Sequence, residues 1–416
     1  MSIKSLKDSV VKKVSRVFGP GLVTGASDDD PSGIATYSQA GALFGLNTLW
    51  TAVFTFPLMA ALQEMCARIG LVTKKGLIGT IKSFYPTWLV TLIVLISFTA
   101  IVLNIGADLA GMGAVANMLI PAIPSYVFST CIGLFLSYYI VVLPYAKIAF
   151  YLKWFCLSLL CYIIVPFLSD QDWHQVLRST FVPHIILDKQ YLLIIIGILG
   201  TTISPYLFFW QTSMEVEEIE EKKLVVDKKI IHVMQNDIKT GIFFSNLVFF
   251  FIILSTGTVL HSSGIKEIQT VDQAAMALRP LAGKLTYLLF AVGVIGTGLL
   301  AIPVLASSVS YMVSEAFNWE EGLNKKFKEA KGFYAIMILS IFIAMSINFT
   351  GVSPVKALVV TAIIYGLTAP LIIFVILLVS NNKKIMGDYT NKIWSNVLGI
   401  SAFLLMVAAA ITLLFI

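Results

Sequence analysis

The sequence predicts an all-α polytopic membrane protein with about eleven transmembrane helices, two of them broken. Three observations support this fold class. Hydrophobic residues make up 58% of the 416 residues and charged residues only 12%, with a mean hydropathy of +0.88. Apolar runs of membrane-spanning length recur along the whole chain, and proline interrupts two of them at corresponding positions. Soluble domains carry about 25% charged residues, so this composition excludes a soluble enzyme and a disordered chain as starting hypotheses.

Eleven apolar runs, each bounded by charge, proline or glycine, predict the spans. A transmembrane helix needs about 20 mainly apolar residues, so the runs use almost the entire chain and leave no room for a soluble domain. The runs are 18–44, 47–70, 86–118, 124–144, 148–168, 190–214, 238–260, 285–314, 333–350, 354–380 and 393–415. The predicted organisation is a cytoplasmic N-terminal segment (1–17), a first five-helix repeat (18–168), an extracellular loop (169–189), a second five-helix repeat (190–380) and a segment containing the last span (381–416).

The distribution of Lys and Arg predicts the orientation. If the N-terminus is cytoplasmic, the cytoplasmic segments hold all but six of the 29 basic residues, and an excess of Lys and Arg marks the cytoplasmic side. These segments are 1–17, 68–85, 145–153, 215–239, 315–332 and 381–392. The C-terminus then lies outside. The six on the outer side are Arg178, Lys189, Lys266, Arg279, Lys284 and Lys356. Because topology accounts for the net charge of +6, we expect the lipid bilayer as a partner and no nucleic acid.

The first span is interrupted by three consecutive acids, in the sequence DDDPSG at residues 28–33. A carboxylate inside a span is costly and marks a functional site, while proline removes a backbone donor and glycine tolerates unusual dihedral angles. Broken backbone at membrane depth persists only where protein buries it or where it lines a wet cavity. We therefore predict a cation site at the break. The alternative is that residues 18–27 form a re-entrant or surface segment, with the acids in water.

The sixth span carries a second interruption, GTTISPY at residues 200–206. An ordinary proline kink would be the simpler explanation for this break alone. However, Pro31 and Pro205 stand at matching positions of two five-helix halves, and an odd number of helices makes the halves enter the membrane from opposite sides. Paired interrupted helices in an inverted repeat are the best pointer in a sequence to a transporter's midplane site.

Three further polar features have two readings each. Asp108 in span three indicates an ion or proton pathway, or an acid satisfied by hydroxyl groups or outer water. Asn246 in span seven indicates the same pathway, or an interhelical hydrogen bond. The Glu-rich run at 215–221 is typical of a solvated helix end, with an acidic vestibule for cations as the alternative.

At these residues the chain resembles the Nramp family of divalent-metal transporters. GPG at 19–21 leads to DPSG at 30–33, where that family has an Asp-Pro-Gly-Asn motif. ARIGLVT at 67–73 is similar to the end of the family's second helix, and Phe243, Phe244 and Asn246 to its seventh. The resemblance implies a leucine-transporter-like fold of inverted five-helix repeats with broken helices 1 and 6. It also implies a transporter rather than an enzyme, with metal ions as substrates and no cofactor.

The departures from the family's motifs concern the metal site. The resemblance implies that Asp30 is the main ligand, but the family's Asn falls on Gly33, and its sixth-helix Met and His fall on Ser204 and Tyr206. Without a thioether the donors are oxygen atoms, which suit magnesium, calcium or manganese. The pattern looks like the Nramp-related magnesium transporters, so we expect import of Mg²⁺, and also Mn²⁺, through a bacterial cytoplasmic membrane by alternating access. The predicted metal-site residues are Asp30, Asp29, Asp28, Ser27, Gly33, Thr201, Ser204 and Tyr206, with Asp108 and Asn246 on an ion or proton pathway.

The chain also departs from the family at the positions associated with proton coupling. Proton-coupled members carry a Glu where this chain has Gly111, arginines in the ninth helix and a His in the sixth, and this chain has none of these residues. We expect transport without proton coupling. The alternative is a proton-coupled Mn²⁺/Fe²⁺ importer of the ordinary Nramp type. A sodium-coupled amino-acid carrier is disfavoured because three acids would repel a substrate carboxylate, and a membrane enzyme because no nucleophile–base pair stands out.

Overall fold

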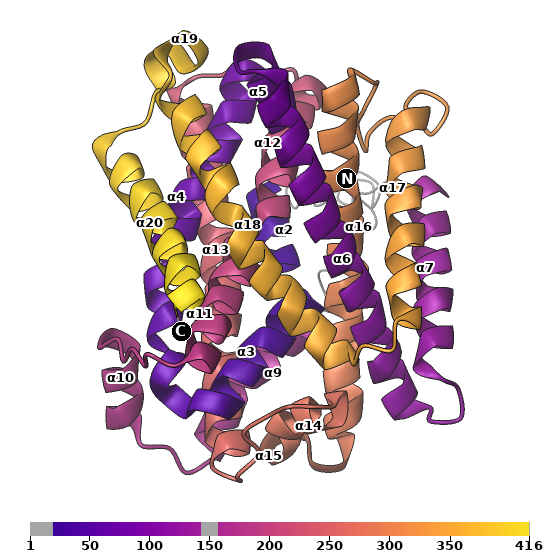
Figure 1. Ribbon diagram of the computed structural model, residues 1–416, viewed down its shortest axis with the longest axis vertical. Coiled ribbons are helices and arrows are strands. Elements are labelled where there is room, and N and C mark those ends of the chain that lie inside the picture. Colours follow the sequence, from indigo (N-terminus) through magenta and orange to yellow (C-terminus); the bar gives the residue numbers. More distant parts are fainter. Residues whose placement is uncertain (1–19, 143–156, 416) are drawn as a thin grey trace, which may run out of the picture.

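The computed structural model describes residues 20–142 and 157–415, and every regular element in these ranges is a helix (Figure 1). The first predicted span consists of α2 (Pro20–Asp28) and α3 (Pro31–Phe44), and the sixth of α11 (Lys189–Thr202) and α12 (Pro205–Lys222). Proline starts α3 and α12, where its missing N–H costs nothing. Both predicted breaks are therefore confirmed.

The remaining long helices follow the other apolar runs, although the helix in run 238–260 begins ten residues earlier than predicted, at Lys228. They are α4 (Trp50–Thr73), α6 (Thr87–Leu119), α7 (Ser125–Val142), α13 (Lys228–Thr256), α16 (Thr286–Phe317), α17 (Lys331–Met345), α18 (Pro354–Asn381) and α20 (Ile393–Phe415). Among the described residues, nine helical segments are long and apolar enough to cross a membrane. The first span is not among them, since its halves α2 and α3 have 9 and 14 residues, and the fifth run lies partly outside the described residues. The total of eleven stays a prediction.

Short elements make up the rest of the described structure; η2, α9 and η3 fall in the predicted fifth span, and the others lie between or beside the long helices. The α-helical ones are α5 (Leu77–Phe84), α9 (Cys161–Ile164), α10 (Trp173–Phe181), α14 (Val271–Ala275), α15 (Arg279–Ala282) and α19 (Lys383–Met386). The tighter or wider turns are η1 (Gly45–Thr48), η2 (Leu157–Leu160), η3 (Val165–Leu168), η4 (Gly257–His261, a π-turn), η5 (Met276–Leu278), η6 (Gly283–Leu285), η7 (Ser346–Phe349) and η8 (Gly387–Tyr389).

The connections separate to two ends of the bundle. Helices α5 and α19 lie at one end, and α10, α14 and α15 at the other (Figure 1). We call these the α5 end and the α14 end. The segments assigned to the cytoplasm contain α5 and α19, and those assigned to the exterior contain the other three, so the predicted sidedness is internally consistent. The predicted cytoplasmic segments 1–17 and 145–153 lie outside the described residues. Which end faces the cytoplasm stays a prediction.

Helix α2 lies directly against α13 because glycines allow the two backbones to touch. A Cβ atom added at Gly25 would lie only 2.2 Å from the carbonyl oxygen of Gly241. The backbone N–H of Gly21 donates to Asp237 Oδ2 at 2.7 Å, near the start of α13. Small residues at helix contacts are typical of membrane bundles, where association depends on close packing and hydrogen bonds. The contact fixes the half of the first span that leads from the α5 end to the acids.

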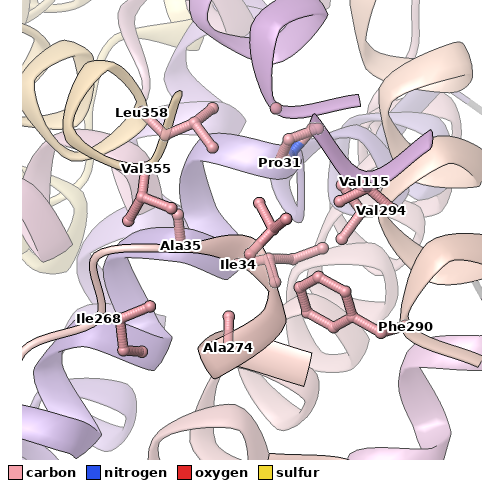
Figure 2. A pocket seen from close by; sticks show the side chains of 12 residues that line it. Pro31, Ile34, Ala35, Val115, Ile268, Ala274, Phe290, Val294, Val355 and Leu358 are labelled. Carbon is pink, nitrogen blue, oxygen red and sulfur yellow. The ribbon is translucent and has the colours of Figure 1, made fainter. Parts of the chain in front are cut away.

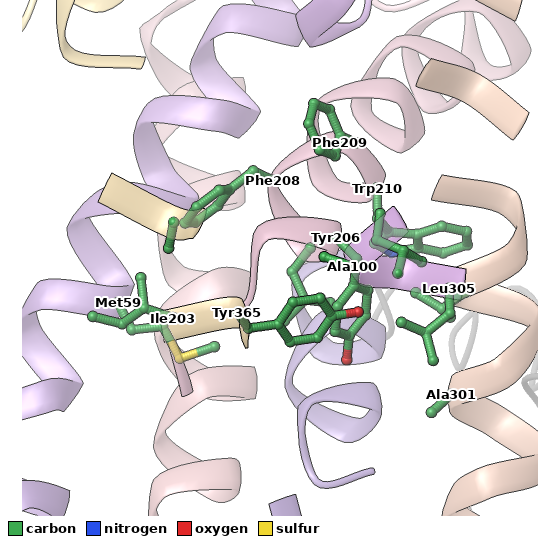
Figure 3. Close-up of a cluster of buried hydrophobic side chains, with 14 of the residues drawn as sticks. Met59, Ala100, Ile203, Tyr206, Phe208, Phe209, Trp210, Ala301, Leu305 and Tyr365 are labelled. Atoms are coloured by element: carbon green, nitrogen blue, oxygen red, sulfur yellow. The ribbon is translucent and has the colours of Figure 1, made fainter. Parts of the chain in front are cut away.

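Large aromatic side chains fix the second break. Tyr206 and Trp210 in the first turns of α12 are fully buried, and Figure 3 shows them with Ala301 and Leu305 of α16 on one side and Tyr365 of α18 on the other. The Tyr206 and Tyr365 rings lie 6.0 Å apart. An interior packed as densely as a protein core does not yield to small shifts, so the start of α12 has a defined position relative to its neighbours.

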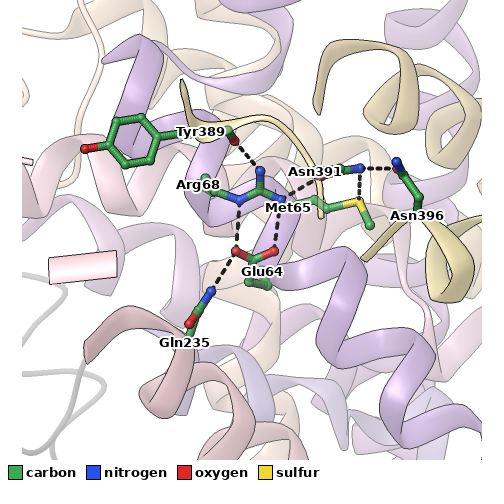
Figure 4. Close-up of polar contacts among 7 residues, drawn as sticks. All are labelled: Glu64, Met65, Arg68, Gln235, Tyr389, Asn391 and Asn396. Carbon is green, nitrogen blue, oxygen red and sulfur yellow. Dashed lines mark hydrogen bonds and ion pairs between the residues drawn. The ribbon is translucent and has the colours of Figure 1, made fainter. Parts of the chain in front are cut away.

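An ion-pair network joins α4 to the C-terminal helices at the α5 end (Figure 4). Arg68 donates from Nε and a second nitrogen to the two carboxylate oxygens of Glu64, at 2.9 and 3.0 Å. The same guanidinium donates to Asn391 Oδ1 at 2.7 Å and to the backbone oxygen of Tyr389. Gln235 of α13 donates to Glu64 Oε1 at 3.2 Å. The Arg68–Glu64 pair thus connects α4 to α13 and to the segment between α18 and α20.

We expect Arg68→Met to lower stability by about 3 kcal/mol, because it leaves the Glu64 carboxylate nearly buried and without its cation. Adding Glu64→Gln should recover part of the loss, since no unpaired charge then remains. Thermal unfolding of the purified variants in detergent measures both effects. Lys222→Met is the matched control: it breaks the exposed pair with Glu218, which has the same i,i+4 spacing. An exposed pair contributes under about 1 kcal/mol to stability. Equal losses of stability in Arg68→Met and Lys222→Met would contradict the stabilising role of the Arg68–Glu64 network.

Candidate metal-ion site

The two helix breaks touch each other inside the bundle. The hydroxyl of Tyr206, at the start of α12, donates to the backbone oxygen of Ser27, near the end of α2, at 2.7 Å. The hydroxyls of Tyr37 and Thr202 are 3.2 Å apart. A Cβ atom added at Gly33 would lie 3.2 Å from Thr201 Oγ1. The structure therefore brings the predicted residues of the first and sixth spans to one place.

The three acids of the first break are enclosed by protein. Asp28, Asp29 and Asp30 are 1%, 4% and 2% exposed. Ser245 of α13 donates to Asp28 Oδ2 at 2.8 Å and lies 3.4 Å from Asp29 Oδ1. The alternative in which these acids face water at the surface is wrong. Protein therefore excludes solvent from almost the entire surface of the three carboxylates.

Asp30 is held more firmly than its two neighbours. Its Oδ1 accepts from the backbone N–H of Gly33 and from the hydroxyl of Ser32, both at 2.7 Å, so it caps the N-terminus of α3. Its Oδ2 accepts from Asn104 Nδ2 of α6 at 2.9 Å. The start of a helix carries partial positive charge, which favours an anion there. Asp30 is thus the carboxylate with a defined orientation at the centre of the two breaks.

Asp108 belongs to the same cluster. Asn104 Nδ2 also lies 3.2 Å from Asp108 Oδ2, one helical turn away, so a single amide bridges Asp30 and Asp108. Asp108 is fully buried, and its Oδ1 has no hydrogen-bond partner among the residues that the structure describes. The sequence singled out Asp108 but not Asn104. A polar residue four positions before a buried acid on one helix was the available signal, because residues at i and i+4 share a face.

The Ser204 side chain hydrogen-bonds to the backbone at the break in the sixth span. Its hydroxyl donates to the backbone oxygen of Thr201 at 2.5 Å and is 3.3 Å from that of Gly200. Ser204 and Thr201 are each 1% exposed. The hydroxyl therefore binds a carbonyl that the break has freed, and a hydroxyl and a carbonyl oxygen lie together at the second break.

Asn246 does not join the cluster through any hydrogen bond in the described structure. Its Nδ2 donates to Ile242 O of its own helix at 3.2 Å, and its Oδ1 accepts from Thr55 of α4 at 3.3 Å. This is the interhelical hydrogen bond that the sequence left open as the alternative. The neighbouring Ser245 contacts the acids instead, because the next position along a helix points to a different face.

The Glu-rich run at the end of α12 divides into two parts. Glu220 and Glu221 are exposed, as expected for a solvated helix end. Glu215, in contrast, is buried and accepts from Gln211 Nε2 at 2.8 Å, so the prediction of a solvated end is wrong at that position. Nearby, in the connection between α16 and α17, burial and the carboxylates of Glu315 and Glu217 raise the pKa of Glu321 to about 10. This end of the bundle holds several acids in protein rather than in water.

A small apolar cavity lies beside the first break (Figure 2). Pro31 and Ile34 of α3 line it together with Phe290 and Val294 of α16, and Ile268 and Ala274 close it near α14. The labelled side chains carry no oxygen that could hold an ion. The cavity therefore separates the acids from the α14 end by an apolar layer and is not itself an ion site.

The arrangement limits the metal chemistry that the site can perform. Within the described ranges, no group of three His, Cys, Asp or Glu side chains is arranged to hold a metal ion. An ion at the breaks would therefore take one or two carboxylates and complete its shell with carbonyl, hydroxyl, amide or water oxygens. Such donors suit Mg²⁺, Ca²⁺ and Mn²⁺. Magnesium in particular keeps several waters and uses one or two carboxylates.

Comparisons with known proteins agree with this picture. The family model described as natural resistance-associated macrophage protein-like matches residues 21–416. The divalent metal cation transporter MntH of Caldanaerobacter subterraneus is 23% identical, over 94% of this chain and 90% of its own. The MntH of Mesorhizobium japonicum is 25% identical, over 91% and 83%.

Solved structures share the fold. A manganese transporter of Eremococcus coleocola matches with a TM-score of 0.74 and 18% identity, covering 96% of this chain and 86% of that one. Mhp1, a nucleobase-cation-symport-1 family transporter, matches with a TM-score of 0.51 and 13% identity, over 95% and 92%. The predicted leucine-transporter-like architecture is confirmed. With the family model spanning nearly the whole chain, the protein belongs to the Nramp family: it is a membrane transporter of divalent metal ions and not an enzyme.

Proposed function

We propose that this protein is a secondary transporter that imports a divalent cation by alternating access, with Asp30 as the central ligand. The observation that carries the proposal is the enclosed junction of the two broken helices, where Asp28, Asp29 and Asp30 are buried and where Tyr206 and Thr201 of the sixth span lie against Ser27 and Gly33 of the first. Buried carboxylates that lack cationic partners among the described residues are stable only if a cation or protons neutralise them. A transporter supplies that cation as its substrate.

The relatives favour Mn²⁺ as the transported ion. The matching proteins are named divalent metal cation transporters, and the structural neighbour a manganese transporter. These names support the second hypothesis of the sequence analysis, an importer of the ordinary Nramp type, better than the first. Oxygen donors accept Mn²⁺ as readily as Mg²⁺, so the donors at the two breaks are compatible with this ion.

Mg²⁺ transport without protons is the second candidate function. It is favoured by Ser204 and Tyr206, which offer hydroxyl groups where a thioether and an imidazole would select transition metals. It is also favoured by Gly111, which offers no titratable side chain one turn after Asp108. An inside-negative potential of 100 mV favours entry of a divalent cation by about 4.6 kcal/mol, twice the value for one charge. That driving force is sufficient without a proton gradient.

Uptake into proteoliposomes tests both candidates. The purified protein is reconstituted with a pH dye inside, an inside-negative potassium potential is imposed, and Mn²⁺, Mg²⁺ and Ca²⁺ are supplied separately. The expected result is saturable Mn²⁺ entry. Acidification of the lumen together with Mn²⁺ entry supports the ordinary type. Mg²⁺ entry without acidification supports the second candidate. Uptake equal to that of protein-free liposomes for every ion would overturn the proposed function.

A further inference from the structure

Asn104 occupies a position between the two acids that dominate the interior of this site. Its Nδ2 lies 2.9 Å from Asp30 Oδ2 and 3.2 Å from Asp108 Oδ2, and all three residues are buried. Asn104 belongs to α6, whereas Asp30 lies between α2 and α3. Its amide therefore connects the break in the first span to a separate helix of the bundle.

The oxygen atom of the same amide makes no hydrogen bond within the described structure. Asn104 Oδ1 is inaccessible to solvent and has no hydrogen-bond partner among the described residues, and the same holds for Asp108 Oδ1. A buried polar atom without a partner is rare in native proteins and calls for an explanation such as a bound ion. Two such oxygens, on residues one helical turn apart and both in contact with Asp30 or its partner, point to a cation rather than to a donor from the protein.

A carboxamide suits this position because it carries a hydrogen-bond donor group and an acceptor oxygen side by side. The NH₂ group is a double donor and can take the place of a cation between two carboxylates, while the carbonyl oxygen is an acceptor that binds cations directly. A half-turn of the terminal amide exchanges the two. Gly33, on the other side of Asp30, has no side chain and faces Thr201 too closely to leave room for a carboxamide without displacement.

We propose that Asn104 is a ligand of the transported ion and helps to set ion selectivity. With the ion absent, its NH₂ group bridges Asp30 and Asp108 and offsets their mutual repulsion. With the ion bound, its Oδ1 joins Asp30 in the coordination shell. This inference deepens the proposed function, because it places a neutral oxygen donor from α6 in the same site.

The test uses direct Mn²⁺ binding to the purified protein by calorimetry, with transport measured separately. Asn104→Leu keeps the shape of the side chain but removes both the NH₂ donor and the oxygen acceptor. We expect about a tenfold or greater loss of Mn²⁺ affinity. Asn104→Asp keeps an oxygen ligand and removes the donor, and we expect it to retain affinity within about threefold of the unmodified protein while changing the ratio of Mn²⁺ to Ca²⁺ affinity. A residue that only positions Asp30 through its NH₂ group would fail equally in both variants.

Ser97→Ala is the matched control, because Ser97 is a buried, unpartnered polar residue on the same helix, away from the acids. It should leave Mn²⁺ affinity unchanged. Equal affinity in Asn104→Leu and the unmodified protein, or equal loss in Leu and Asp, overturns the proposal for Asn104. Because binding is measured apart from transport, an unmodified protein that binds Mn²⁺ but does not carry it overturns the proposed function alone. Absence of Mn²⁺ binding to the unmodified protein overturns both.

Discussion

Asp30→Asn is expected to reduce divalent-metal uptake to the level of protein-free liposomes. The substitution removes the one carboxylate that the structure orients by three hydrogen bonds at the junction of the breaks. It does not remove the helix cap, because Asn caps helices about as well as Asp. Loss of transport therefore reports the missing charge and not a missing start of α3. Uptake of Mn²⁺ in reconstituted liposomes, with equal protein per vesicle, measures the effect.

The control for this variant is Asp272→Asn, which neutralises an exposed carboxylate on α14. Its uptake should match that of the unmodified protein. Asp28→Asn is informative beside it, because Asp28 contacts Ser245 and does not cap a helix. We expect a partial loss there, smaller than at Asp30. Normal uptake by Asp30→Asn would remove Asp30 from the site and transfer the ligand role to its neighbours.

The sequence was sufficient for most of the fold. The predicted span 354–380 and the helix Pro354–Asn381 agree to within one residue at each end, because the apolar length needed to cross a membrane is nearly constant. The positions of both breaks were also predictable from the sequence. Proline is disfavoured in the interior of a helix and favoured at its first position, and Pro31 and Pro205 begin α3 and α12. Proline alone does not identify a break, because Pro57, Pro303 and Pro370 lie inside α4, α16 and α18; the polar residues beside Pro31 and Pro205 supplied the rest of the signal.

The partners of the acids were not predictable in the same way. Ser245 and Asn104 reach Asp28 and Asp30 from helices that are distant in sequence. On α6 the i,i+4 pair of Asn104 and Asp108 was a signal for the polar face, but on α13 nothing in the local pattern separates Ser245, which contacts the acids, from Asn246, which contacts Thr55. In a span that is apolar on every face, hydrophobic periodicity does not identify the buried side. The error at Glu215 has a related cause. Composition predicts that a Glu-rich helix end is solvated, but Glu215 packs against Gly70 of α4, and the connection after α16 covers Glu217.

The second large effect concerns ion selectivity. Ser204→Met places a thioether where α12 begins, beside the freed carbonyl of Thr201 that the serine hydroxyl now occupies. A soft sulfur donor adds affinity for Mn²⁺ over Mg²⁺, because Mg²⁺ prefers oxygen and gives up water reluctantly. We expect the ratio of Mn²⁺ to Mg²⁺ uptake to rise by about tenfold, which corresponds to about 1.4 kcal/mol. Competition between the two ions in the same liposomes measures the ratio.

Two companion variants separate the sulfur from the loss of the hydroxyl and from crowding. Ser204→Ala removes the hydroxyl alone and should leave the ratio within about twofold of the unmodified protein, a difference of about 0.4 kcal/mol. Adding Gly33→Asn to Ser204→Met supplies an amide oxygen, but its Cβ must displace Thr201, Asp28 or Tyr37 by a few tenths of an ångström. We therefore expect the double variant to raise the preference for Mn²⁺ further while lowering the maximal rate. If Ser204→Met and Ser204→Ala change the ratio equally, selectivity does not depend on the donor at residue 204, and the oxygen atoms around Asp30 must set it instead.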